Sequence, residues 1–310
     1  MKILVTGGAG FIGSHVVESL VKCGHEVSVV DNLITGRVSH VPLGVRLYQV
    51  DVASPELLSA VVAERPDAIV HLAAQISVSA STRDPEEDAR VNIGGALNVL
   101  RAAHASGCGR IVYSSSAAVY GNPSSLPLQE GASMRPLSPY GVSKRAAEDY
   151  FLADAAATDL TIGVLRYGNA YGPRQAVSAE CGVTTIFVQK ILEGQSPTIF
   201  GDGSATRDYV YVGDVAEATV TALYNDKNLI VNISSGQETS VQALWDQLIA
   251  LAGKNIKPCY GAERLGDITR SCLDPSLAWR ELSWRSTTSL QEGLKKTLEY
   301  YTALGRTEGC

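Results

Sequence analysis

The sequence has little that would place it in a membrane or direct it out of the cell. Its 310 residues contain no apolar run approaching the roughly 18 residues that a membrane-spanning helix needs. Met1 and Lys2 lead directly into a short apolar strand pattern and a glycine-rich turn, which leaves no place for the apolar region of a signal peptide. We therefore expect a cytoplasmic protein that does not associate with membranes.

Signals for metal or nucleic-acid binding are equally scarce. The six cysteines, at positions 23, 108, 181, 259, 272 and 310, form no CxxC pair and have no histidine cluster near them. We therefore predict reduced cysteines, with neither a metal site nor a disulfide framework. The net charge is -6, from 26 basic and 32 acidic residues, so the basic excess of a nucleic-acid-binding protein is missing.

Repeats and low-complexity tracts are also absent, and the first half of the chain instead alternates short apolar runs with longer helical patterns. We expect strands at 3–6, 27–30, 45–50, 68–72, 110–114 and 161–165, and helices at 11–22, 55–63 (capped by Ser54), 91–105 and 141–157. Strands that are apolar throughout and are each followed by a helix indicate a parallel sheet covered on both faces. The predicted fold class is therefore α/β, with a doubly wound parallel sheet of the Rossmann type.

The pattern changes beyond about Gly168, where loops become longer and more polar. We predict a dinucleotide-binding domain over residues 1–168, joined by about 208–233, because Val231 to Ile233 reads as a strand that returns to the main sheet. A smaller substrate-binding domain is expected from residues 169–207 and 234–310, since irregular loops of this kind commonly carry binding residues.

A glycine-rich turn separates the first predicted strand from the first helix. Gly7, Gly10 and Gly13 have the spacing GxxGxxG. In such a turn the first glycine makes the bend, the second lets the backbone approach a pyrophosphate, and the third lets the helix pack on the strand. The amino terminus of the helix, at Phe11 and Ile12, offers N–H groups and a partial positive charge to the phosphates. The turn predicts a dinucleotide site.

The ends of the following strands add candidate cofactor residues. Asp31 lies 18 residues after Gly13, where a carboxylate can bind the ribose hydroxyls and repel a 2′-phosphate, so NAD is favoured over NADP. Arg37, six residues later, could soften this preference for NAD, but its positive charge would have to outweigh the carboxylate of Asp31. Asp51 and Val52 follow the third strand, where the acid either contacts the adenine or is simply solvated. The fourth strand ends in small residues that let backbone pack on the cofactor (Leu72, Ala73, Ala74 and Gln75), and His71 is expected to be structural rather than catalytic.

A tyrosine and a lysine are spaced one helical turn apart near the middle of the chain. Tyr140 and Lys144 follow Pro139, which favours the start of a helix, and their i, i+4 spacing puts both side chains on one face. Because a nearby ammonium group favours a phenolate, we expect Lys144 to lower the pKa of Tyr140 and make it a usable base near neutral pH. The run from Ser114 to Ser116 ends a predicted strand at the same edge of the sheet and supplies a hydroxyl for the reacting oxygen.

These motifs together resemble the extended short-chain dehydrogenases/reductases, and most of all the UDP-glucose 4-epimerase family. The matching segments run almost from end to end: TGGAGFIGSH at 6–15, DNLITGR at 31–37, HLAAQISV at 71–78, SSSAAVYG at 114–121, SPYGVSK at 138–144, NAYGPRQ at 169–175, GDGSATRDYVYV at 201–212 and RLGD at 264–267.

The resemblance assigns roles to individual positions. It makes Ser116 the hydroxyl of a catalytic triad, Tyr140 the proton acceptor and donor, and Lys144 a ligand of the nicotinamide ribose. It places further residues at the cofactor (Asn32, Gly36, Asn92, Ser114 and Tyr167) and others at the sugar nucleotide (Ser116, Asn169, Arg207, Arg264 and Ser271). Guanidinium groups suit a diphosphate because they bind its oxygens through two hydrogen bonds.

The activity that the resemblance implies is NAD-dependent interconversion of UDP-glucose and UDP-galactose through a transient 4-keto sugar. A homodimer is implied as well, formed by helices 94–105 and 141–157, whose alanines permit close packing. Ser271 stands where some members have a tyrosine that excludes acetylated sugars, so UDP-GlcNAc and UDP-GalNAc remain alternative substrates. UDP-uronic acids remain another, with Arg270 as a partner for the extra carboxylate.

Other activities of the superfamily fit less well. The 4,6-dehydratases place Asp-Glu directly after the triad hydroxyl, and the related decarboxylases place a glutamate at the second of these positions, where this chain has Ala117 and Ala118. An alanine transfers no proton. The alternative from a different class is a non-catalytic, NAD-sensing regulator, and such proteins typically lose the tyrosine or the lysine that this chain keeps.

Overall fold

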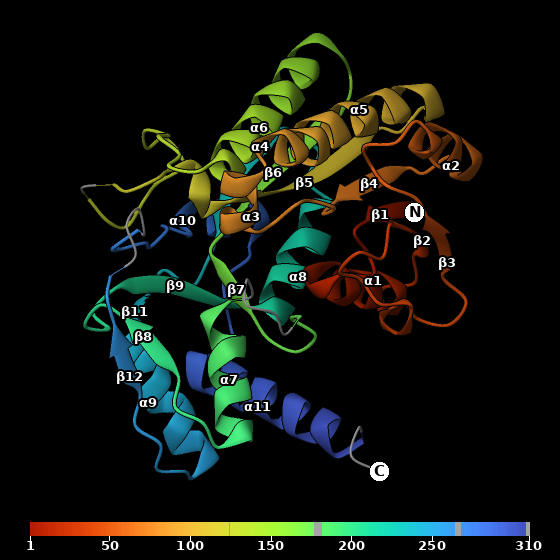
Figure 1. The fold of residues 1–310 in the computed structure, drawn as a ribbon. Helices are drawn as coiled ribbons and strands as arrows, with labels where there is room; N and C mark the ends of the chain where they lie inside the picture. The colour runs from red at the N-terminus through yellow and green to blue at the C-terminus, as the bar shows by residue number, and fades with distance from the viewer. Residues whose placement is uncertain (124, 177–181, 264–267, 308–310) are drawn as a thin grey trace.

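A parallel sheet of seven strands forms the centre of the structure (Figure 1). The computed structural model describes residues 1–123, 125–176, 182–263 and 268–307. The sheet has the order β10-β6-β5-β4-β1-β2-β3 and is parallel throughout. Its strands are β1 (Lys2–Thr6), β2 (Glu26–Asp31), β3 (Arg46–Gln49), β4 (Ala68–His71), β5 (Arg110–Ser116), β6 (Thr161–Tyr167) and β10 (Leu229–Ile233). The predicted doubly wound fold is confirmed, and β10 lies at one edge of the main sheet.

Helices cover both faces of this sheet (Figure 1). One face packs on α1 (Phe11–Lys22), α8 (Val212–Ala222) and α10 (Ser276–Leu282), and the other on α2 (Glu56–Glu64), α5 (Gly95–Ser106) and α6 (Pro139–Ala157). Successive residues of β1 point to opposite faces, so Ile3 and Val5 enter the first core while Leu4 enters the second. This arrangement explains why the central strands are apolar at every position.

Two predicted helix starts differ from the structure. α2 begins after Pro55 with no side-chain cap, so the expected cap by Ser54 is wrong. The expected helix at 91–105 is preceded by α4 (Pro85–Ala89) and begins as a π-helical turn, η2 (Arg90–Gly94), before α5 continues it. By contrast, α6 begins at Pro139 with the Ser138 hydroxyl accepting a hydrogen bond from the Gly141 N–H at 3.2 Å.

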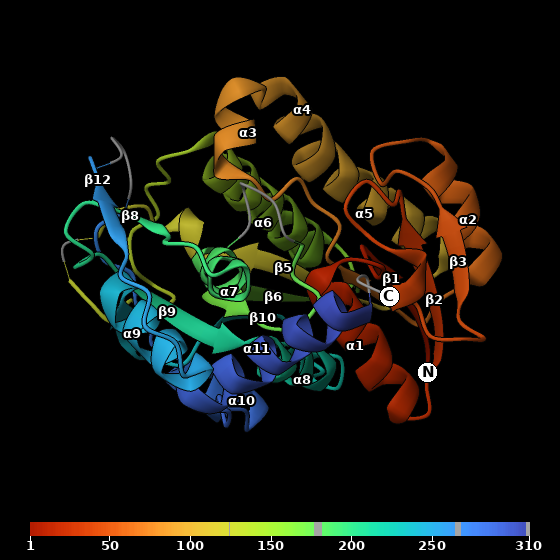
Figure 2. The same cartoon turned by 60° about the horizontal axis from the view of Figure 1, so that its bottom comes forward.

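The remaining elements gather beside the carboxyl edge of the main sheet (Figure 2). A small sheet has the order β11-β9-β7, and β12 pairs with β8. A third apolar core joins this sheet to the helices around it, with Phe187 and Trp245 in edge-to-face contact at 5.2 Å. These elements are β7 (Asn169–Tyr171), α7 (Val183–Glu193), β8 (Thr198–Phe200), β9 (Thr206–Tyr211), β11 (Glu238–Ser240), α9 (Val241–Ala252), β12 (Cys259–Gly261) and α11 (Leu290–Thr307). Three short elements lie in loops of the first half: α3 (Val78–Arg83) and the 3-10 turns η1 (Val38–His40) and η3 (Ala117–Val119).

The described residues also bear on the expectations drawn from composition. None of their helices combines the length and the apolar character needed to cross a membrane. Within the same residues, no three or more His, Cys, Asp or Glu side chains come together as metal ligands would. The cysteines that the structure describes, at 23, 108, 259 and 272, carry free thiols.

Candidate functional site

The glycine-rich turn lies between β1 and α1, at the point where the order of the strands reverses. Gly7 has a φ of +71°, and a Cβ atom there would come within 2.7 Å of the Ala73 N atom at the end of β4. A Cβ atom on Gly13 would lie 2.0 Å from the Gly7 carbonyl oxygen. The sequence therefore keeps this end of α1 as bare backbone, and Gly10 precedes the helix without a side-chain cap. Such a turn at a switch point fits the pyrophosphate of a dinucleotide.

Asp31, the last residue of β2, binds the backbone of this turn. Its carboxylate is buried and accepts hydrogen bonds from the Ala9 N–H at 3.0 Å and the Leu33 N–H at 2.8 Å. Gly36 packs against it, since a Cβ atom there would be 2.7 Å from Asp31 Oδ1. A carboxylate oxygen has the capacity to accept more than one hydrogen bond, so Asp31 can hold the turn and still bind ribose hydroxyls. Asn32 instead accepts from the Ile34 N–H at 3.1 Å.

Two other predicted cofactor residues have partners of their own. Asp51 forms an ion pair with Arg90 at 2.9 Å and accepts from the Ala53 N–H at 2.8 Å. Its predicted contact with adenine therefore competes with Arg90. The Tyr167 side chain lies in the core, and its hydroxyl is 2.7 Å from Thr219 Oγ1. The Tyr167 phenol is therefore turned into the core and already has a partner.

The end of β4 is tied to the π-helical turn. Asn92 is buried, and its side-chain oxygen accepts from the Gln75 N–H at 2.9 Å while its amide donates to the Gln75 carbonyl oxygen at 3.0 Å. The loop from Leu72 to Gln75 is thereby held beside the glycine-rich turn. π-Helical turns often mark functional positions, and this one directs Asn92 at the predicted site. The predicted structural role of His71 fits its burial and its 2.8 Å hydrogen bond with Thr6 Oγ1.

The structure brings the three predicted catalytic residues together at the end of β5. The Lys144 ammonium group is buried, donates to the Ser114 carbonyl oxygen at 2.9 Å and lies 6.0 Å from the centre of the Tyr140 ring. Ser116 ends the strand, and its hydroxyl accepts from the Ala118 N–H at 3.2 Å. The Tyr140 phenol lies beside Ser116, whose hydroxyl acts to lower its pKa through a hydrogen bond. The phenol of Tyr140, the hydroxyl of Ser116 and the ammonium group of Lys144 therefore lie together next to the glycine-rich turn.

The pKa of Tyr140 differs from the expectation. Burial raises the pKa of Tyr140, and the hydrogen bond with Ser116 only partly opposes this rise. Burial also lowers the pKa of Lys144 to about 8. The expectation that Tyr140 is a usable base near neutral pH is therefore not met in the protein alone, because loss of solvent keeps its pKa above the ordinary value.

The predicted substrate residues lie on or beside the small sheet. Asn169 begins β7 and is exposed, and Arg207 lies on β9, where its guanidinium donates to the Thr206 carbonyl oxygen at 2.7 Å. Ser271 is almost fully buried beside the start of β9, where the Thr206 N–H donates to the Thr269 carbonyl oxygen at 2.9 Å. Arg264 lies outside the described residues.

Arg270, the residue considered for a uronate, already has a partner. Its guanidinium binds Glu238 through two hydrogen bonds, one of them 2.5 Å and the other 2.9 Å. The positive charge is thereby neutralised in this structure. A uronate substrate finds no free cation at Arg270.

Sequence reasoning missed three buried charged residues around the site, which are Asp88, Glu148 and Arg166. Glu148 follows Lys144 by one helical turn and Asp88 precedes Asn92 by one, so the i, i+4 spacing was available as a signal. Nothing in the sequence shows that these charges are buried, however, since acidic residues on helices usually face solvent.

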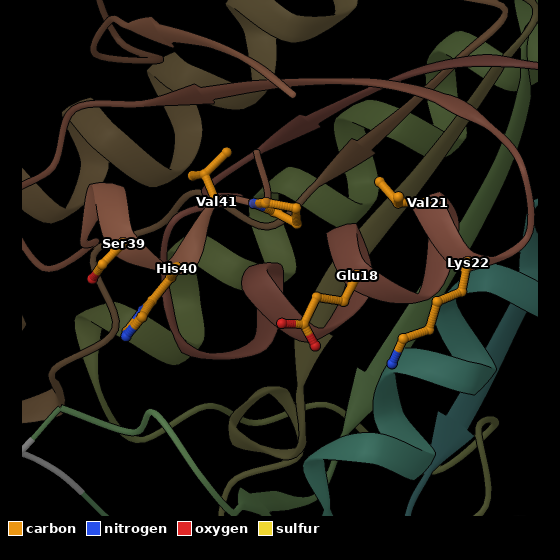
Figure 3. A pocket seen from close by; sticks show the side chains of 7 residues that line it. Glu18, Val21, Lys22, Ser39, His40 and Val41 are labelled. Carbon is orange, nitrogen blue, oxygen red and sulfur yellow. The ribbon is translucent and has the colours of Figure 1, made fainter. Parts of the chain in front are cut away.

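A surface groove of about 330 Å³ lies between α1 and the segment around η1 (Figure 3). Its lining residues are Glu18, Val21, Lys22, Ser39, His40, Val41 and Pro42. None of them is a predicted catalytic, cofactor or substrate residue, so the groove carries no part of the predicted chemistry.

Comparisons with known proteins cover nearly the whole chain. The model of the NAD dependent epimerase/dehydratase family matches residues 3–234. A UDP-glucose 4-epimerase from Mycolicibacterium smegmatis is 38% identical over 308 residues, covering 97% of this chain and 98% of its own. The solved UDP-glucose 4-epimerase of Thermotoga maritima with UDP-glucose is 41% identical with a TM-score of 0.96, covering 98% and 99%. That of Thermus thermophilus with NAD is 40% identical with a TM-score of 0.92, covering 97% and 99%.

Proposed function

The chain belongs to the NAD-dependent epimerase/dehydratase family, and from that premise we propose that it interconverts UDP-glucose and UDP-galactose by inverting C4 of the sugar. The observation that carries this proposal is the convergence of Tyr140, Ser116 and Lys144 beside the glycine-rich turn. The predicted resemblance, the enzymatic activity and the dependence on NAD are all supported by relatives that align over nearly the whole chain.

The residues of the chain divide the work of proton transfer and orientation. Tyr140 takes the proton of the sugar 4-hydroxyl and returns it when the opposite face is reduced. Ser116 binds the same oxygen, and Lys144 supplies a positive charge that stabilises the phenolate. When bound, NAD supplies the reversible hydride transfer. The glycine-rich turn and Asp31 hold its diphosphate and its ribose.

In this proposal, residues 169–207 and 234–310 form the part of the protein that binds the nucleotide of the substrate. Arg207 and Arg264 bind the diphosphate, and Asn169 helps to hold it while the 4-keto sugar turns between its two faces. A dehydratase or decarboxylase is disfavoured because Ala117 and Ala118, which form η3 directly after Ser116, have no group that transfers a proton.

The test is to incubate the purified protein with UDP-glucose, UDP-galactose, their acetylated counterparts and UDP-glucuronate, and to identify the products. We expect UDP-glucose and UDP-galactose to interconvert without added NAD, because each turnover restores the cofactor that the protein retains. Accumulation of NADH in proportion to product, or a product that has lost water or carbon dioxide, would contradict the proposal.

Ser271 bears on the choice between plain and acetylated sugars. Its small side chain leaves room for an acetamido group, so we expect the wild type to accept UDP-GlcNAc. Ser271→Tyr is expected to lower the turnover of UDP-GlcNAc by about tenfold or more while UDP-glucose changes little, since bulk added to a pocket discriminates by size. Turnover of UDP-glucose by the same variant is the control. Equal turnover of the acetylated sugar by both proteins would refute the role of Ser271.

We further propose that the protein works in the cytoplasm. We also propose that it forms a homodimer in which α5 and α6 of one copy pack against α5 and α6 of the other. Leu97 on α5 and Val142 on α6 are exposed apolar residues on these helices. Leu97→Glu is expected to shift the protein from dimer to monomer in sedimentation, because it places a charge in an apolar interface. A wild type that sediments as a monomer would rule the dimer out.

A further inference from the structure

Asp88 on α4 is a buried carboxylate that the proposed reaction does not use. Its exposed fraction is 1%. Within the described ranges, no lysine, arginine or histidine forms an ion pair with it. Its Oδ1 atom accepts hydrogen bonds from Gln75 Nε2 at 2.9 Å and Asn92 Nδ2 at 3.1 Å. Burying a charge without a cationic partner costs free energy, so its position calls for a reason.

Hydrogen bonds connect this carboxylate to the first turn of α6. The amide of Asn92 that donates to Asp88 also donates to Ser143 Oγ at 3.0 Å. The Ser143 hydroxyl donates in turn to the Tyr140 carbonyl oxygen at 3.0 Å. Asp88 is therefore joined through two side chains to the turn of helix that carries Tyr140 and precedes Lys144.

The negative charge of Asp88 acts on both of these catalytic groups. Burial lowers the pKa of Lys144 to about 8, and Asp88 and Glu148 oppose that fall. Burial raises the pKa of Tyr140, the hydrogen bond with Ser116 lowers it, and Asp88 raises it further. Both groups therefore lose their protons at a higher pH with Asp88 present than they would without it.

The other titratable groups around the pair are neutral or already neutralised. On β5, burial raises the pKa of Tyr113 well above its ordinary value, and on β4, burial lowers that of His71 to about 3. Glu148, on α6 itself, is bound to an arginine at 2.6 Å. On the elements that pack against α4, Arg83 of α3 is exposed and Arg90 of η2 binds two other carboxylates. Asp88 on α4 is thus the buried carboxylate near the ammonium group to which no cation is bound among the described residues.

We propose that Asp88 is a positioning residue whose buried negative charge stabilises the ammonium form of Lys144, and that it thereby sets the pH range in which Tyr140 exchanges protons. The inference rests on the proposed function for its catalytic meaning. The arrangement keeps a positive charge beside the phenol in a place where burial alone favours the neutral amine.

The test is Asp88→Asn, which keeps an oxygen that can accept from Gln75 and Asn92 but removes the charge. Glu86→Gln is the matched control, because Glu86 is an exposed acid on the same helix. Two quantities are measured from pH 6 to 11: the rate of epimerisation, and the tyrosinate absorbance of Tyr140. The absorbance of Tyr140 is obtained by subtracting the tyrosinate absorbance of the same protein carrying Tyr140→Phe.

We expect Asp88→Asn to move both limbs of the rate profile and the midpoint of the Tyr140 titration to lower pH by about one unit. Glu86→Gln should move neither. A titration midpoint in Asp88→Asn equal to that of the wild type would overturn the inference, because a purely structural anchor would not alter the charge. Asp88→Ser, a smaller neutral acceptor, replaces Asp88→Asn if the latter does not fold.

The two proposals fail in distinguishable ways. The absorbance titration needs no turnover, so it still tests Asp88 if the wild type does not epimerise UDP-glucose. If the wild type is active and the variant titrates unchanged, only the inference about Asp88 fails.

Discussion

Tyr140→Phe is expected to lower the rate of epimerisation by about 100-fold or more, because it removes the proton acceptor and leaves the rest of the site in place. The phenol oxygen is the group of Tyr140 whose pKa Ser116 lowers. The backbone N–H of Tyr140 donates to Ser81 Oγ at 3.1 Å, and this contact survives the substitution. Initial rates with UDP-galactose, measured at saturating substrate, report the loss.

The same helix supplies the control for this substitution. Tyr150 lies on α6 ten residues further on, with its side chain 47% exposed. Tyr150→Phe removes the same oxygen away from the site and should change the rate by less than about twofold, as is usual for exposed positions. Unchanged thermal unfolding and NAD content in Tyr140→Phe would assign its defect to chemistry. A Tyr140→Phe protein that retains most of the wild-type rate would remove the acid–base mechanism and favour an NAD-sensing role.

Much of the site was predictable because its signals are local. The glycines at 7 and 13 are required by backbone crowding, which any sequence with this turn must satisfy. The start of α6 follows from Ser138 and Pro139, whose preferences act within one helical turn. Once that start is fixed, the helical repeat places Tyr140 and Lys144 on one face.

The features that escaped prediction depend on tertiary burial. The sequence puts Lys144 near Tyr140, but the loss of solvent that raises the pKa of Tyr140 arises from segments that fold over the pair. The π-helical turn at Asn92 is another example, since the side chain it carries forms hydrogen bonds with Gln75 and Asp88, which come from other parts of the fold. Neither effect can be inferred from periodicity.

The length of β6 shows the same limit. The apolar pattern predicts a strand that ends at Leu165, because a charged residue follows it. The strand in fact continues through Arg166 to Tyr167. Arg166 is only 2% exposed, and Glu148 on α6 neutralises it. A strand can therefore contain a buried charge when its partner comes from a helix that the pattern does not connect to it.

Removing one partner of the buried pair of Arg166 and Glu148 is expected to have a large effect on stability. Arg166 donates to Glu148 through Nη2 at 2.6 Å and through Nε at 3.0 Å, and its Nη1 donates to the Tyr120 hydroxyl and to the Glu130 carbonyl oxygen, each at 2.9 Å. Glu148→Met removes the only carboxylate bound to this guanidinium among the described residues and leaves a buried positive charge. We expect the free energy of unfolding to fall by about 3–5 kcal/mol.

The physical basis is tested by removing both partners. Arg166→Met should destabilise the protein as strongly as Glu148→Met, whereas the double variant should lose much less than the sum, because neither charge is then left unpaired. Unfolding in urea measures all four proteins. Glu299→Ala, which breaks the exposed pair with Lys295 on α11, is the control and should cost about 0.5 kcal/mol or less. Additive effects of the two Met substitutions would show that the residues contribute separately, and that lost packing rather than an unpaired charge explains the destabilisation.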